Sequence, residues 1–185
     1  KTMVKKLAID WDESELRLVA AQCSGSNVTV TDAAVIPISE SGINETLRST
    51  ISRLGLENTE TLVAIGRGKA ELRELQLPPV PDDELPDMVR FQAIRNFATA
   101  GEAATVDFLV TNRGESGVDL IAAAVGPNSL TEIRQTCEAA DLLTNRICLR
   151  PLAAAALYLI HHKTSSDKDT VLIDLLSDDA EIVVS

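Results

Sequence analysis

The chain has 185 residues, with 28 acidic and 17 basic side chains that give a formal net charge of −11. Hydrophobic residues make up 45% and charged residues 24%, which is typical of a globular protein and excludes a disordered one. The acidic balance argues against nucleic acid and against an anionic membrane surface as the main partner, since both favour basic patches.

The cysteines and the apolar runs limit the compartment and the membrane topology. Cys23, Cys137 and Cys148 are odd in number and none has CxxC spacing, so we expect no disulfide framework and no zinc site. The longest apolar run, residues 152–160, is far shorter than the roughly 20 residues that span a bilayer. We therefore expect a protein of a reducing compartment that does not itself insert into a membrane.

The first third of the chain predicts an antiparallel meander followed by a helix. Apolar residues predict a strand at residues 3–10, alternation predicts one at 15–23, and a high content of Val, Thr and Ile predicts one at 28–38. Asn44 is expected to cap a helix that runs to Leu54, where Gly55 ends it. A short buried strand at residues 61–65 then precedes a turn at residues 66–69.

The middle of the chain predicts a strand, a helix, two strands and a second helix. These elements are expected at residues 72–77, 82–100, 106–111, 118–125 and 127–140. The two central strands are joined by an expected hairpin loop at residues 112–117. The first helix carries an apolar stripe at intervals of four residues, which we expect to face a core: Leu85, Val89, Ala93 and Phe97.

The last part of the chain predicts a short strand, a helix and a hairpin. The strand is expected at residues 146–149, and the helix at 152–161 is apolar nearly all round, so we expect it to be buried. The hairpin strands are expected at residues 171–175 and 181–184. Because the last strand has no further partner, we expect the chain to be a piece of a longer protein.

The hairpins at the two ends of the chain share one pattern. Each begins with an apolar strand that ends in Asp, at Asp10 and Asp174, and continues through a short acidic turn into a second strand. An Asp at a strand end can simply start a turn, and that interpretation stays open. Two facing Asp-tipped hairpins are also what the actin-like fold uses to surround nucleotide phosphates with backbone N–H groups.

Several short motifs, in order along the chain, carry a family resemblance. They are residues 75–78, 81–85, 89–93, 107–108, 120–124, 139–142 and 149–153. No single motif is specific, and the ordered series carries the weight. The series resembles the type IV pilus assembly protein PilM, an actin-like protein related to FtsA. The cytoplasmic domain of the type II secretion protein GspL is similar, and it keeps this architecture without a working nucleotide site.

The resemblance implies both a fold and a domain organisation. The class is α/β: residues 1–69 plus 143–185 would form an actin-like (RNase H-like) subdomain of the first lobe. Residues 70–142 would form an inserted small α+β subdomain of the PilM and FtsA kind. The second lobe would lie beyond Ser185 and is absent from this chain.

The resemblance also implies a function. The protein would be a cytoplasmic scaffold of a type IV pilus or type II secretion assembly, peripheral to the inner membrane through a partner. That partner would be a PilN-like inner-membrane protein whose cytoplasmic tail is bound. The acidic chain would suit a tail that carries Lys or Arg. Self-association is left open.

The phosphate-site residues that the resemblance implies lie in two loops: Asp10, Asp12, Ser14, Asp174 and Ser177. Actin-like phosphate loops normally carry Asp-x-Gly, because glycine lets the backbone approach the phosphate. Neither loop here has a glycine, and Asp12, Glu13, Asp178 and Asp179 would add negative charge beside a phosphate. We therefore expect a degenerate site with no catalytic residue and no resident cofactor, although the full-length protein could still bind Mg-ATP.

Two other interpretations remain open. Asp10 and Asp174 could supply carboxylates to the first lobe of an active actin-fold ATPase or sugar kinase, or the chain could be an unrelated α/β domain.

The remaining motifs indicate little chemistry. Residues 66–69 lack the spacing of a nucleotide-binding P-loop. The pair His161-His162 has no further metal-binding side chain nearby in the sequence, which predicts neither a metal site nor a Ser-His-Asp arrangement.

Overall fold

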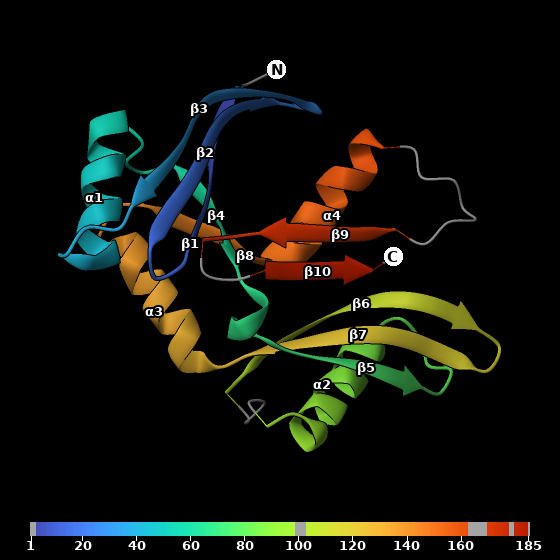
Figure 1. Cartoon of the computed structure of the whole chain (residues 1–185). Coiled ribbons are helices and arrows are strands. Elements are labelled where there is room, and N and C mark those ends of the chain that lie inside the picture. The colour runs from blue at the N-terminus through green and yellow to red at the C-terminus, as the bar shows by residue number, and fades with distance from the viewer. Residues whose placement is uncertain (1–2, 99–102, 163–169, 178–179, 185) are drawn as a thin grey trace. The chain divides into compact units, whose positions relative to one another are not determined.

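The computed structural model describes residues 3–98, 103–162, 170–177 and 180–184. The chain divides into two compact units, each of which is described by itself. Unit 1 comprises Lys1–Arg67 and Ile133–Ser185, and unit 2 comprises Gly68–Glu132. Figure 1 shows the elements of both units in chain order, from blue at the N-terminus to red at the C-terminus.

Unit 1 is built on a five-stranded sheet with the strand order β3-β2-β1-β4-β8. Its strands are β1 (Val4–Trp11), β2 (Glu15–Ser24), β3 (Asn27–Pro37), β4 (Glu60–Ile65) and β8 (Leu143–Leu149). The pairs β1–β2 and β2–β3 are antiparallel, so the predicted meander is confirmed. The pairs β1–β4 and β4–β8 are parallel. The sheet is therefore mixed, as the order of predicted elements indicated.

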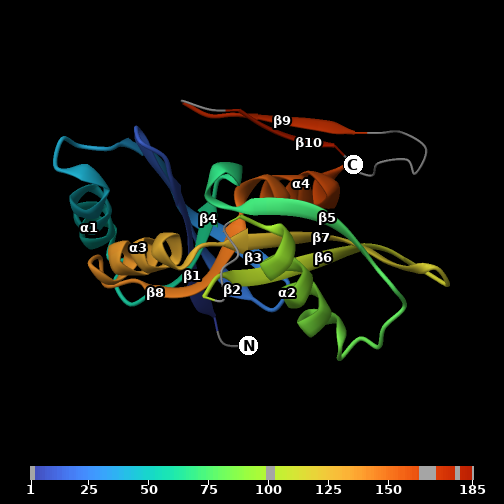
Figure 2. The same ribbon diagram turned by 90° about the horizontal axis from the view of Figure 1, so that it is seen from below.

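The core of unit 1 lies on one face of this sheet. Leu7 and Ile9 of β1 are almost fully buried, and their alternation with exposed neighbours follows from the period of two in a strand. Helix α1 (Gly42–Leu54) buries Leu47 and Ile51. Helix α3 (Pro127–Glu138) contributes the buried Cys137 from its C-terminal part. In Figure 2 both helices lie on the same side of the sheet.

The limits of α1 confirm one prediction and correct another. Gly55 ends the helix in the left-handed conformation with φ of 60°, as expected. The predicted N-cap at Asn44 is wrong, because the helix begins two residues earlier, at Gly42, and Ser41 occupies the cap position. The Thr46 hydroxyl accepts the Ser39 N–H at 3.0 Å, which ties the entering chain to the first turn of the helix.

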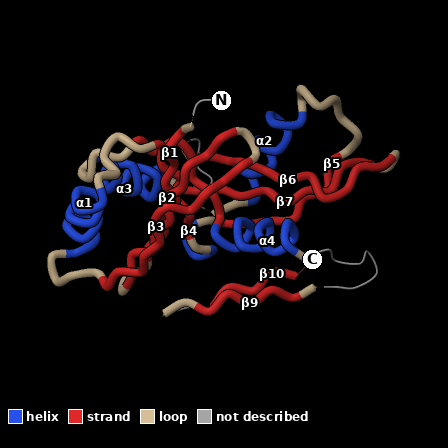
Figure 3. Tube along the Cα trace, turned by 90° about the horizontal axis from the view of Figure 1, so that it is seen from above, coloured by secondary structure: helices blue, strands red, loops and turns tan. Residues whose placement is uncertain are grey.

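Helix α4 (Arg150–His161) corrects a prediction of burial. Pro151 is the buried residue of this helix, while Leu157, Leu159 and Ile160 are 59%, 49% and 77% exposed. The helix packs against β4, β8 and a separate two-stranded hairpin, which together cover only part of its surface. That hairpin, β9 (Val171–Leu175) and β10 (Ala180–Val184), is antiparallel as predicted. Figure 3 shows it as a pair of strands separate from the main sheet.

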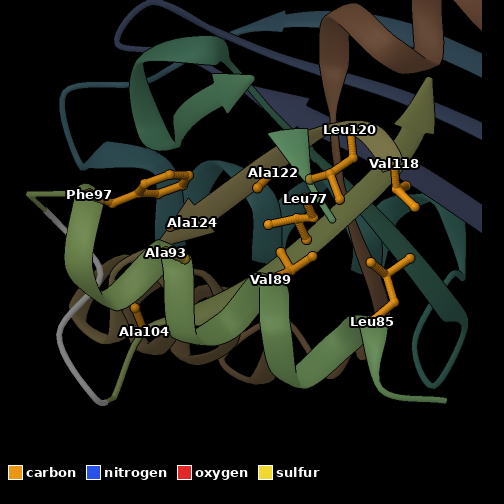
Figure 4. Packing of buried hydrophobic residues seen from close by; sticks show 10 residues of the cluster. All are labelled: Leu77, Leu85, Val89, Ala93, Phe97, Ala104, Val118, Leu120, Ala122 and Ala124. Carbon is orange, nitrogen blue, oxygen red and sulfur yellow. The ribbon is translucent and has the colours of Figure 1, made fainter. Parts of the chain in front are cut away.

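Unit 2 has three antiparallel strands in the order β5-β7-β6, covered on one face by helix α2 (Leu85–Asn96). Its strands are β5 (Glu71–Leu77), β6 (Thr105–Gly114) and β7 (Gly117–Val125). The predicted stripe on α2 faces the core, where Val89 and Ala93 are fully buried (Figure 4). The helix is shorter than predicted: Asp82, Asp83 and Glu84 precede it, and Phe97 is already extended. The predicted end at Ala100 lies outside the described residues.

The β6–β7 hairpin turns more tightly than the sequence predicted. Both strands extend into the expected loop, and Gly114 pairs with Gly117 across a two-residue turn. Gly117 has φ of +144°, and a Cβ there would lie 2.2 Å from the carbonyl oxygen of Leu77. The close approach of β5 to β7 at this end of the sheet therefore requires glycine.

Candidate functional site

The predicted site residues of the first loop form a compact turn at the end of β1. The Asp12 carboxylate accepts the backbone N–H groups of Ser14 and Glu15, both at 2.8 Å, and the Ser14 hydroxyl at 3.0 Å. This is the turn-forming behaviour of Asp, in which a short side chain satisfies the backbone two residues on. No residue from Trp11 to Ser14 has a positive φ, so the turn does not require glycine.

Arg17 crosses from β2 to the same turn. It stands directly opposite Asp10 in the β1–β2 register, and its Nε and Nη2 lie 2.9 Å and 3.1 Å from the two carboxylate oxygens of Asp10. The same Nη2 lies 2.7 Å from Oδ2 of Asp12. The contact with Asp10 is bidentate, which is the strong geometry for an arginine–carboxylate pair. One guanidinium group therefore pairs with two of the predicted carboxylates, and its Nη1 lies 3.2 Å from a third carboxylate, that of Glu15.

Arg150, the first residue of α4, links the turn to the second hairpin. Its Nη1 lies 2.8 Å from Asp10, and its Nε and Nη2 lie 2.9 Å and 3.1 Å from the carboxylate of Glu181 on β10. The Glu181 side chain is 3% exposed and also accepts the backbone N–H of Arg67 at 2.7 Å. A Cβ on Gly66 would lie 2.8 Å from Nη2 of Arg150, so the missing side chain makes room for this ion pair.

The two predicted loops contact each other directly. The hydroxyl groups of Ser14 and Ser177 lie 2.7 Å apart, and Ser177 donates a hydrogen bond of 3.1 Å to Asp12. Asp174 faces Glu181 in the β9–β10 register, but within the described part of the chain it forms no hydrogen bond or ion pair through its side chain. Asp178 and Asp179 lie outside the described residues. The structure thus brings Asp10, Asp12, Ser14 and Ser177 together and leaves Asp174 unlinked.

Ionisation of this cluster is set by its ion pairs. Burial raises the pKa of Asp12, but hydrogen bonds from Arg17 and from the Ser14 and Glu15 amides outweigh it, so the pKa lies well below its usual range. The hydrogen bond with Asp10 raises the pKa of Arg17. Burial lowers the pKa of Arg150, but its pairing with Glu181 and Asp10 raises it overall. All three groups are therefore charged across the physiological range.

Arg17, Arg150 and Glu181 are functional-site residues that were not predicted from the sequence. Arg17 lies on the Asp10 face of the predicted meander and could have been found from the strand alternation. Arg150 and Glu181 could not, because their contact joins a helix start to a distant strand. Within the ranges that the structure describes, no group of His, Cys, Asp and Glu is arranged to hold a metal ion. In the same ranges no helix is long and apolar enough to cross a membrane.

The fold defines the class of this protein. No family model and no curated protein matches the sequence. Among solved structures, the chain resembles a Bacteroides thetaiotaomicron protein of actin-like ATPase fold and unknown function. That match has a TM-score of 0.55 and 9% identity, and it covers 98% of this chain and 65% of the other. The chain has the actin-like ATPase fold, which confirms the α/β class predicted from the sequence.

Two other similar structures belong to secretion and pilus machinery. One is a chain of the PilM–PilN type IV pilus biogenesis complex, with a TM-score of 0.82 and 17% identity over 97% of this chain. The other is the cytoplasmic domain of EpsL, an inner-membrane component of the type II secretion system of Vibrio cholerae. Its TM-score is 0.62 and its identity 17%, and the match covers 98% of this chain and 68% of that cytoplasmic domain. This chain spans 57% of the length of the matched chain of the pilus complex. The PilM resemblance seen in the sequence thus agrees with the fold.

Proposed function

We propose that this chain is an actin-like scaffold of a type IV pilus or type II secretion assembly and binds the cytoplasmic tail of an inner-membrane partner. One observation carries the proposal: the fold matches a chain of the PilM–PilN complex with a TM-score of 0.82 over 97% of this chain. The name of that complex pairs PilM with PilN, and a PilN-like protein is the partner that we propose here. The protein would then be cytoplasmic and attached to the membrane only through its partner.

The charge of the chain favours a basic tail. A net charge of −11 attracts segments that carry Lys and Arg, which are common on the cytoplasmic side of membrane helices. Attraction between exposed charges is screened by salt. The tail should therefore bind more weakly as the ionic strength increases.

We further propose that the phosphate site is degenerate and binds no nucleotide. In the nucleotide-binding arrangement the two loops would hold a phosphate between them, whereas here Ser14 and Ser177 meet at 2.7 Å. The two nearby cations are already paired, Arg17 with Asp10 and Asp12, and Arg150 with Asp10 and Glu181. A phosphate would have to separate these pairs while approaching four carboxylates, because Glu15 also lies 3.2 Å from Arg17. This arrangement disfavours the alternative of an active ATPase or sugar kinase.

Calorimetry with Mg-ATP tests the degenerate site. The longest natural form of the protein should be used, since the chain spans 57% of its matched relative in the pilus complex. We expect no heat of binding at roughly millimolar nucleotide, a concentration that detects complexes as weak as about −4 kcal/mol. Binding that requires magnesium and is lost in Asp10→Ala would contradict this part of the proposal and favour an ATPase.

Peptide binding tests the scaffold role separately. The probe is the cytoplasmic tail of the PilN-like protein from the same organism, and the control is a peptide of identical length with its basic residues replaced by Gln. We expect the native tail to bind and the control to bind at least tenfold more weakly at low salt. A tail that does not bind at all would contradict the proposed partner, whatever the result with nucleotide.

A further inference from the structure

The outward face of α2 in unit 2 carries an apolar patch that the proposed function does not explain. Phe91 is 55% exposed and Ile94 is 40% exposed, although aromatic side chains are among the most costly to leave in water. They cannot belong to the core of unit 2, because Val89 and Ala93 face it and Phe91 lies about 200° around the helix from Val89. Figure 4 shows the inward residues of this helix pointing at the sheet.

Charges of opposite sign flank the exposed Phe91 at equal separations in the sequence. Asp87 lies four residues before Phe91 and Arg95 four residues after it, so the three side chains share one face of the helix. Both charged side chains are exposed. The Arg95 guanidinium lies over the Phe91 ring, 5.4 Å from its centroid, which keeps the cation beside the apolar patch. Neither Asp87 nor Arg95 forms a salt bridge within the described residues.

The order acid–aromatic–base becomes base–aromatic–acid when the helix is reversed. Two copies of α2 packed antiparallel around a two-fold axis at Phe91 would place each Asp87 beside Arg95 of the other copy. Such an interface is isologous, since the same patch serves on both sides. Phe91 of each copy would be covered at the centre, where aromatic residues contribute most to binding.

We propose that this surface, Asp87, Phe91, Ile94 and Arg95, binds a second copy of the same chain. The charges alone have a simpler explanation, because an acid in the first turn and a base in the last turn suit the helix dipole. That explanation does not require an exposed phenylalanine between them. A single helix pair is a small interface, so the association is weak and reversible. None of these four residues belongs to the predicted phosphate site.

Charge reversal on the full chain, followed by sedimentation equilibrium up to roughly millimolar protein, tests the pairing. In a dimer of either single variant, Asp87→Arg or Arg95→Asp, residues 87 and 95 of the two copies carry like charges where they meet. We therefore expect each variant alone to self-associate at least tenfold more weakly than the wild type. An equimolar mixture of the two variants restores both opposite-charge pairs and should associate as the wild type does. A helix-dipole effect gives no such recovery. A mixture that stays as weak as the single variants, or a wild type that remains monomeric throughout, overturns the proposal.

A matched pair of truncations locates the contact. Phe91→Ala should weaken self-association roughly thirtyfold, as expected for a central aromatic anchor. The control is Leu109→Ala on β6, which removes an equally exposed apolar side chain of the same unit, 54% against 55%. The control should associate as the wild type does. Equal weakening by both substitutions would show that α2 is not the contact surface and would overturn the proposal.

Discussion

The hairpins β1–β2 and β9–β10 share a sequence pattern but are held in place by different forces. The first belongs to the five-stranded sheet and buries Leu7, Ile9, Leu16 and Leu18 almost completely. The second forms its own two-stranded sheet, and one of its faces exposes Val171, Ile173, Leu175, Ile182 and Val184 by 57–78%. Its buried side chain is instead the carboxylate of Glu181, paired with Arg150. Apolar burial therefore dominates in the first hairpin, whereas in the second the deeply buried side chain is charged and Leu172 and Val183 are only half-buried.

This difference shows how little a local pattern says about its surroundings. A strand, an Asp, an acidic turn and a second strand specify a hairpin in both places. Whether its apolar side chains become core depends on which elements lie against them, and that is a property of the whole fold. The contrast can be tested by substitutions, which we give from the largest expected effect to the smallest.

Truncating matched isoleucines should separate the hairpins most clearly. Ile9→Ala should lower the free energy of unfolding of unit 1 by about 3 kcal/mol, because it leaves a cavity at a site 2% exposed. Ile182→Ala, at a site 64% exposed, should cost under about 0.5 kcal/mol. Urea unfolding followed by the fluorescence of Trp11, the single tryptophan, measures both. Similar losses for the two variants would mean that the hairpins are packed alike.

Removing the buried carboxylate should release only the second hairpin. Glu181→Gln leaves Arg150 with Asp10 as its remaining ionic partner and should cost about 2 kcal/mol locally. Hydrogen exchange should show faster exchange of the β9 and β10 amides and unchanged exchange in β1 and β2. The control is Asp174→Asn, which faces Glu181 but forms no ion pair among the described residues. Equal loosening of both hairpins would disprove the separation.

The part of the free energy of unfolding that the first loop loses in acid should come largely from Asp12. Because the folded pKa of Asp12 is lowered, its contribution is present above the unfolded pKa of about 4 and is lost as the pH falls further. Asp12→Asn keeps an acceptor for the turn but loses the charged pair with Arg17, so it should cost about 1 kcal/mol at pH 7. Urea unfolding at pH 7, 5, 4 and 3 should show that difference shrinking below about pH 4. A difference that stays constant with pH would contradict the assignment.

Adding a methyl group at Gly66 should have the smallest effect. The new Cβ would lie 2.8 Å from Nη2 of Arg150, at the flexible end of that side chain, so the arginine shifts instead of the backbone. We expect Gly66→Ala to cost under about 1 kcal/mol and to speed amide exchange in β10 slightly. Gly68→Ala is the control, because a Cβ there meets no atom within 4 Å. A larger loss at Gly68 than at Gly66 would contradict the role of Gly66.

Local pattern predicted most of the elements, and it failed where tertiary contacts decide. Alternation identified β1 and β2, because one face of each is buried, whereas β3, which buries no side chain, was identified by its Val, Thr and Ile content. The apolar composition of α4 wrongly predicted burial, since composition does not say how many sides of a helix are covered. Helix α2 ends at Asn96, so that Phe97, the last residue of its apolar stripe, is already extended. Asn and Phe are both weaker helix formers than Leu and Ala, which occupy the stripe at Leu85 and Ala93.

The contacts of the predicted site residues were predicted only in part, for the same reason. Asp10, Asp12, Ser14 and Ser177 do come together, since two Asp-tipped hairpins predicted facing loops. The arginines that form ion pairs with their carboxylates were not predicted. Arg17 could have been predicted from strand alternation, whereas the Arg150–Glu181 pair depends on how α4 starts beside β10. A missing glycine suggested a changed loop but gave no indication of what fills the space.

The parallel pairing of β4 with β8 determines the order in which the chain can fold. All of unit 2 lies between these neighbouring strands in the sequence, so the five-stranded sheet cannot be completed until unit 2 has been synthesised. Unit 2 is one continuous stretch with mostly local pairings, which form quickly. During translation the edge of β4 that later pairs with β8 therefore stays unpaired while unit 2 is synthesised and folds. A chaperone that binds open strand edges would find its substrate in that interval.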